Sequence, residues 1–217
     1  MNLILRPLFC FSLFIMLTGC QTAYYSAMEQ VGVHKRDILV DRVVDARDAQ
    51  SDAQEQFKDA LEQFRSVVQF DGGELDAIYN QLQAEYDDSV DAADDVRSRI
   101  DNVEDVAEAL FEEWTEELTL YSNRKLRDQS ARQLRDTQKR YAELLRSLKQ
   151  AEKRMAPVLS SLQDNVLYLK HNLNARAIGA LKGEFRGIKQ DMDLLLRDMQ
   201  RAIKQSDAFI RQMDKRG

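Results

Sequence analysis

The chain has 217 residues, of which 44% are hydrophobic and 31% are charged, and it contains only two prolines and eight glycines. Sheet-rich folds need more glycine, proline and β-branched residues, so this composition argues against a β-sandwich, a β-barrel and a doubly wound α/β fold. A disordered chain of this charge would lack the regularly spaced Leu, Ile, Val, Met and Phe found here. The composition therefore favours an all-α protein.

Residues 1–19 have the features of a secretory signal peptide. A single positive charge, Arg6, precedes an apolar run over residues 8–17 that is too short to span a bilayer permanently. The next residues resemble a bacterial lipobox, in which an apolar residue and two small ones precede a cysteine that takes up diacylglycerol. This lipobox consists of Leu17, Thr18, Gly19 and the lipidated Cys20. The alternative is a plain signal peptide with an incidental cysteine.

Lipidation of Cys20 predicts where the mature protein lies. Cys10 leaves with the signal peptide and Cys20 carries lipid, so the exported body has no thiol for a disulfide. Gln21 stands where an Asp usually retains this class of lipoprotein at the inner membrane. We therefore expect stable anchoring by the acyl chains in the cell envelope, at the outer membrane and facing the periplasm.

The remaining chain, residues 20–217, is expected to form a single periplasmic helical-bundle domain. Three groups of helix-breaking residues divide it: Asp71-Gly72-Gly73, Ser122-Asn123 and Asn172-Leu173-Asn174. Between them, apolar residues recur every three or four positions, which is typical of a coiled-coil seam. The predicted helices cover approximately residues 25–69, 74–121, 124–171 and 175–214.

Short connections between long helices predict antiparallel neighbours, so the expected architecture is an elongated antiparallel helical bundle or coiled coil of about four long helices. At about 1.5 Å per residue, each helix would be roughly 70 Å long. Pro157 lies inside the third predicted helix and is expected to kink it or divide it into two segments.

Charge is unevenly divided along the chain. Residues 21–120 contain 8 Lys and Arg against 26 Asp and Glu, whereas residues 121–217 contain 22 against 11, giving net charges of −18 and +11. One interpretation is that the acidic second helix pairs with the basic third helix along their shared hairpin. The other is that a basic face of the third and fourth helices stays free for anionic lipid or an acidic partner.

The sequence shows no recognisable catalytic, metal or cofactor site. Asp87, Asp91 and Asp95 lie on one helical face, but a hard-cation site draws its ligands from a loop or from several helices, so a solvated face is the preferred interpretation. His34 and His171 are the only histidines, and the topology places them at opposite ends of the bundle. No phosphate-binding loop occurs, and an exported acidic protein is a poor candidate for binding nucleic acid. We expect a non-enzymatic protein that binds neither nucleotide nor nucleic acid.

Three glycines recur at four-residue spacing in the fourth predicted helix. Each costs about 1 kcal/mol relative to alanine inside a helix, so the spacing suggests a surface that allows close helix approach. Packing against a bulky neighbour such as Tyr141 within the bundle, contact with a partner or a second copy, and local flexibility are the alternatives. The predicted helix-contact stripe consists of Ala175, Gly179, Gly183 and Gly187.

Two segments carry a resemblance to a known family: YYSAMEQVGVHKRDILVDRV at residues 24–43 and LNARAIGAL at residues 173–181. They resemble an uncharacterised family of Gram-negative lipoproteins, domain-of-unknown-function family 2959. The resemblance extends over the whole mature chain and implies lipoprotein export and helical character, but it supplies no activity.

Together these features predict a lipoprotein that is held to the membrane through Cys20 and serves as a non-enzymatic scaffold or adaptor in the cell envelope. Its expected partner is an envelope protein or a second copy of the chain. The alternative is a membrane-surface module that binds anionic lipid through the basic third and fourth helices.

Overall fold

The structure is a computed structural model that describes residues 32–70, 72 and 75–214. These residues form four long helices and no strand, which confirms the predicted all-α fold. The helices are α3 (Lys35–Val68), α4 (Leu75–Glu117), α5 (Arg124–His171) and α6 (Ala175–Asp214). The 48 residues of α5 make it about 72 Å long, which sets the length of the bundle.

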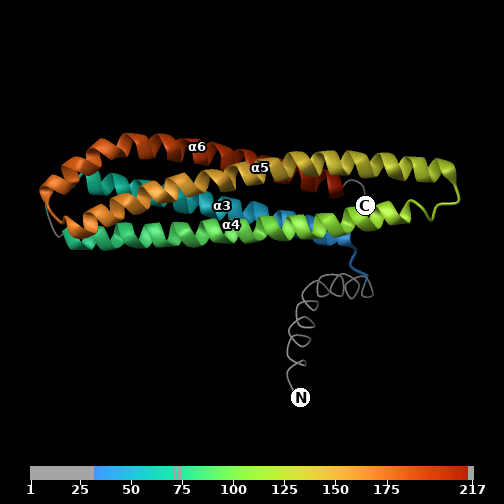
Figure 1. Ribbon diagram of the computed structural model, residues 1–217, viewed down its shortest axis with the longest axis horizontal. Coiled ribbons are helices and arrows are strands. Elements are labelled where there is room, and N and C mark those ends of the chain that lie inside the picture. Colours follow the sequence, from blue (N-terminus) through green and yellow to red (C-terminus); the bar gives the residue numbers. More distant parts are fainter. Residues whose placement is uncertain (1–31, 71, 73–74, 215–217) are drawn as a thin grey trace, which may run out of the picture.

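The helices run up, down, up and down around a shared axis (Figure 1). α3 packs against α4 and α6, and α5 packs against the same two helices. Each helix therefore has two antiparallel neighbours, as the short connections predict.

One continuous apolar core runs through the bundle. Its large, fully buried side chains include Phe57 and Phe64 of α3, Leu148 and Met155 of α5, and Met192 of α6. Gln50 of α3 is an exception, because its side chain is completely buried and neither amide atom has a hydrogen-bond partner. An unsatisfied buried amide of this kind costs about 1–3 kcal/mol.

Two of the approximate helix boundaries differ from the structure by more than one residue. The first helix does not continue back to residue 25, because Gly32 adopts a positive φ of 84° and His34 is extended, so that α3 begins at Lys35; residues 25–31 lie outside the described part. α4 ends at Glu117 and not at residue 121, since the next three residues form a turn.

The expected division of the third helix at Pro157 is also wrong, because α5 is continuous from Arg124 to His171. A helical proline leaves the carbonyl of the fourth preceding residue without its usual donor. Pro157 is exposed, so water can hydrate that carbonyl and the interruption is tolerated.

The four helices do not end at the same level. At one end of the bundle, Arg36 near the start of α3 donates a hydrogen bond to the backbone carbonyl of Met213 near the end of α6. Both residues line a small cavity together with Trp114 and Gln133. Of the described helices, only α4 and α5 continue beyond this level, and Figure 1 shows their hairpin projecting past the other two. Residues 118–123 connect α4 to α5, and we call this connection together with the first four residues of α5, residues 118–127, the α4–α5 tip.

Candidate functional surfaces

The predicted lipidation site is not part of the described structure. Leu17, Thr18, Gly19 and Cys20 all lie outside the described residues, so lipidation stays a prediction from the sequence. Within the described residues, no helix has the length and apolar content that crossing a membrane would require.

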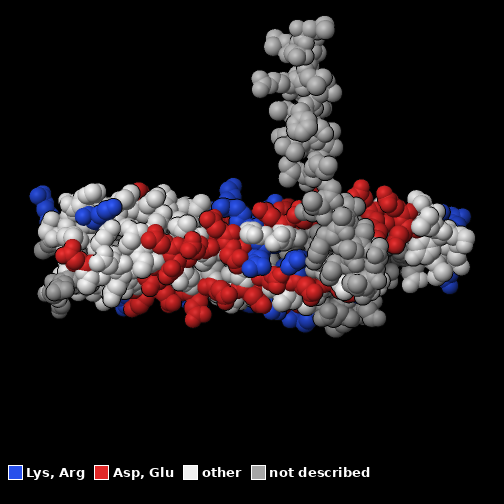
Figure 2. Space-filling view, turned by 90° about the horizontal axis from the view of Figure 1, so that it is seen from below, with Lys and Arg blue, Asp and Glu red and all other residues white. Residues whose placement is uncertain are grey.

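The bundle carries different charges on its two sides. α3 and α4 lie beside each other and contain most of the acidic residues, whereas α5 and α6 contain most of the basic ones. Figure 2 shows Asp and Glu in a band along the α4 side, with smaller groups of Lys and Arg between them and near both ends. The exposed acidic residues of α4 are Asp76, Asp87, Asp88, Asp91, Asp94, Asp95, Asp101, Glu108, Glu112, Glu116 and Glu117.

Opposite charges meet between α4 and α5 at only a few points. The ion pairs seen between described residues of these two helices are Lys149–Glu104 at 2.7 Å and Arg97–Glu152 at 3.1 Å. The hydrogen bond with Glu104 raises the pKa of Lys149, and the one with Glu152 raises the pKa of Arg97. Ion pairs along the hairpin therefore involve a small part of the acidic side chains of α4 and the basic side chains of α5. Most of these side chains face solvent.

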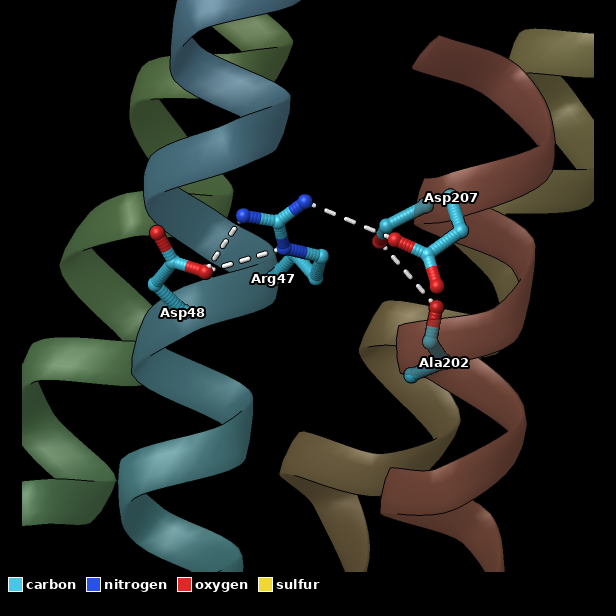
Figure 3. Close-up of polar contacts among 5 residues, drawn as sticks. Arg47, Asp48, Ala202 and Asp207 are labelled. Atoms are coloured by element: carbon cyan, nitrogen blue, oxygen red, sulfur yellow. Dashed lines mark hydrogen bonds and ion pairs between the residues drawn. The ribbon is translucent and has the colours of Figure 1, made fainter. Parts of the chain in front are cut away.

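Arg47 links α3 to α6 (Figure 3). Its guanidinium lies 2.7 Å from Asp48 on the same helix and 3.5 Å from Asp207 across the interface. The hydrogen bond with Asp48, followed by the negative charges of both carboxylates, raises the pKa of Arg47. Next to Asp207, the Ser206 hydroxyl donates to the carbonyl of Ala202 at 3.0 Å, which satisfies a buried polar group within α6.

Asp198 of α6 is a buried carboxylate that sequence reasoning missed. Only 6% of it is exposed, and it accepts hydrogen bonds from Arg154 and Gln150 of α5 and from Arg201 of α6. This network satisfies the carboxylate and fixes α5 against α6. The sequence could have indicated that Asp198 is buried, because it lies three residues after Leu195 and directly before Met199. The apolar spacing places both of these residues in the core.

The glycine stripe lies on the outer surface of α6. Gly179, Gly183 and Gly187 are exposed, and a Cβ added to any of them would meet nothing within 4 Å. The alternative that these glycines allow close packing inside the bundle is therefore wrong. The side chain of Ala175, the fourth predicted member, lies outside the described part.

Beside the stripe, a groove of about 460 Å³ runs between α5 and α6. Its lining includes Asn165 and Tyr168 of α5, Leu181 and Gly187 of α6, and three carboxylates, Asp164, Glu184 and Asp191. It contains no histidine or cysteine. No group of three or more metal-ligating side chains gathers anywhere in the described residues.

The other residues considered as candidates from the sequence also lie apart. His34 precedes the start of α3 and His171 ends α5, and because these two helices run parallel, the histidines lie at opposite ends of the bundle as expected. Asp87, Asp91 and Asp95 are exposed on α4; Asp87 accepts a hydrogen bond from Gln83, and Asp95 pairs with Arg99 at 3.1 Å.

Ionisation of Tyr141 on α5 is expected to make the stability of the protein depend on pH. Burial, followed by the negative charges of Glu104, Glu108 and Asp105, raises its pKa well above 10. The unfolded chain releases the phenol proton near pH 10 while the folded chain keeps it, so the free energy of unfolding should fall as pH rises above 10, by at most about 1.4 kcal/mol per pH unit. Tyr141→Phe keeps the edge-to-face ring contact with Phe111 and should remove this contribution. Urea unfolding at several pH values tests it, and an equal slope in both proteins would contradict it.

The fold and its surfaces define an elongated four-helix bundle with one acidic and one basic side. A family model described as "Protein of unknown function (DUF2959)" matches residues 24–213. The chain belongs to this family. No curated protein and no solved structure gives a match to the chain.

Proposed function

We propose that the protein is a lipid-anchored, non-enzymatic scaffold or adaptor of the bacterial cell envelope, held at the outer membrane and facing the periplasm. The lipobox Leu17-Thr18-Gly19-Cys20 supports the anchoring part of the proposal. Acyl chains on Cys20 would give stable membrane attachment.

The observation that carries the scaffold role is the rod with two differently charged sides. One side presents the exposed acidic residues of α4 and the other presents exposed Lys and Arg of α5 and α6. Complementary charge selects and orients protein partners more than it sets affinity. A tethered rod of about 70 Å can offer these sides to more than one partner along its length.

A second candidate function is binding of anionic lipid by the basic side. It is supported by basic residues of α5 that are exposed and not engaged by α4, such as Arg132, Arg135 and Lys139. Salt-sensitive flotation of the protein with anionic vesicles supports this function, and absence of such binding leaves the adaptor.

The anchoring is tested by fractionating cells that produce the wild-type chain, Cys20→Ser or Cys10→Ser. The wild type and Cys10→Ser should fractionate with the outer membrane, because Cys10 lies in the removed segment. Cys20→Ser should lose the lipid-modified N-terminal peptide, which mass spectrometry detects, together with outer-membrane attachment. Equal outer-membrane attachment of the Cys20→Ser and wild-type proteins, or a wild-type peptide without lipid, would contradict the proposal.

A further inference from the structure

The α4–α5 tip exposes an unusual set of apolar side chains. Leu120 is 81% exposed, Leu126 is 51% exposed and Tyr121 is 41% exposed. The large exposed hydrophobic side chains of the described residues gather at the two ends of the bundle, and these three lie within seven consecutive residues. The tip is well formed, since Asn123 caps α5 by accepting hydrogen bonds from the backbone N–H groups of Lys125 and Leu126.

The same segment carries a concentrated positive charge. Arg124, Lys125 and Arg127 occupy the first turn of α5, and no acidic residue does. A helix N-terminus favours negative groups, so three cations there are unfavourable within the isolated protein and favour an added anion.

These cations are only partly neutralised by the protein. Asp128 is the single carboxylate among residues 118–131; it lies 3.1 Å from Arg127 and 3.8 Å from Arg124. Among the described residues Lys125 forms no ion pair, and Glu116 and Glu117 at the end of α4 pair with none of the three cations.

The tip also lies at the end of the bundle where the N-terminal segment joins it. From the level of Gln133, which α3 and α6 reach, α5 continues nine residues to Arg124, or about 13 Å. Eleven residues lie between Cys20 and Gly32, and the twelve steps along the chain from one to the other span at most about 40 Å. A bilayer that holds Cys20 is therefore within reach of the tip.

We infer that the α4–α5 tip docks on an anionic lipid surface. Leu120, Tyr121 and Leu126 enter the headgroup region, and the three cations contact lipid phosphates. Exposed Leu and Tyr beside Arg and Lys are the side chains that favour the membrane–water interface. The membrane's position in this inference rests on the proposed anchoring at Cys20. The contact would give the rod a second attachment point and thereby a fixed orientation on the bilayer.

Site-specific photocrosslinking of the full chain in intact cells tests this contact. A benzophenone amino acid replaces Leu120, or replaces Ser98 on the exposed shaft of α4 as the control position. Mass spectrometry then identifies what becomes attached. The triple variant Arg124→Gln, Lys125→Gln, Arg127→Gln is compared with a matched triple variant at exposed cations on the shafts of α3 and α4: Lys58→Gln, Arg65→Gln, Arg97→Gln.

We expect anionic phospholipid adducts at position 120 and none at position 98. The tip variant should reduce their yield at least about fivefold, whereas the matched variant should change it less than about twofold. An adduct with another protein at position 120, no phospholipid adduct there, or an unchanged yield in the tip variant would each overturn the inference. Failure of the anchoring appears separately, as an unmodified N-terminal peptide in the fractionation experiment.

Discussion

Phe64→Ala is expected to lower the free energy of unfolding by about 3–5 kcal/mol, the largest loss we predict for a single substitution. Phe64 of α3 is completely buried, and its ring stacks on Phe185 of α6 with centroids 5.9 Å apart and an angle of 16° between the planes. Removing the ring leaves a cavity between two helices that meet through this contact. The cost combines lost burial with the cavity that remains.

Urea unfolding followed by helical circular dichroism measures this loss. Phe64→Leu is the control, because it retains most of the apolar volume and should cost less than half as much. A loss below about 1 kcal/mol for Phe64→Ala would show that this part of the interface between α3 and α6 is not tightly packed.

Replacing the three stripe glycines has the opposite expected result. Gly179→Ala, Gly183→Ala and Gly187→Ala together should raise the free energy of unfolding by about 2–3 kcal/mol. Alanine has the higher helix propensity, and the added methyl groups meet nothing within 4 Å. Urea unfolding measures this increase.

Two further variants check that this gain arises from helix propensity. Gly32→Ala should not stabilise the protein, because Gly32 has a φ of 84°, which alanine rarely adopts. Ala180→Gly, at an exposed position beside the stripe, should cost about 1 kcal/mol. Destabilisation by the triple alanine variant would mean that the glycines are required inside the folded chain. Stabilisation would leave contact with a partner or a second copy, or local flexibility, as the reason for their presence.

The fold could be predicted from the sequence because its signals are local and regular. Apolar residues at three- and four-residue spacing define each helix, and polar or glycine-containing groups separate them, so the boundaries of α5 and α6 are predicted to the residue. Two of the errors fall where one residue decides the outcome. Gly32 ends the helical pattern through its positive φ, and Pro157 fails to end it because it faces solvent.

The surfaces were harder to predict, since they depend on which side of each helix remains uncovered. The spacing of the glycines in α6 is visible in the sequence, but their exposure is not, because the neighbouring helices decide it. The α4–α5 tip was missed for a similar reason. The tip is exposed because α3 and α6 end about 13 Å before the turn between α4 and α5. This offset between the helix ends is known only once the packing of the four helices is known.

Proximity crosslinking of the tagged, lipidated protein in native envelopes, followed by mass spectrometry, tests the adaptor role most directly. Cys20→Ser serves as the mislocalised control. The account predicts that one envelope protein is captured reproducibly with the wild-type chain and is lost with Cys20→Ser. Capture of only the protein itself and its abundant neighbours, equally with both forms, would contradict it.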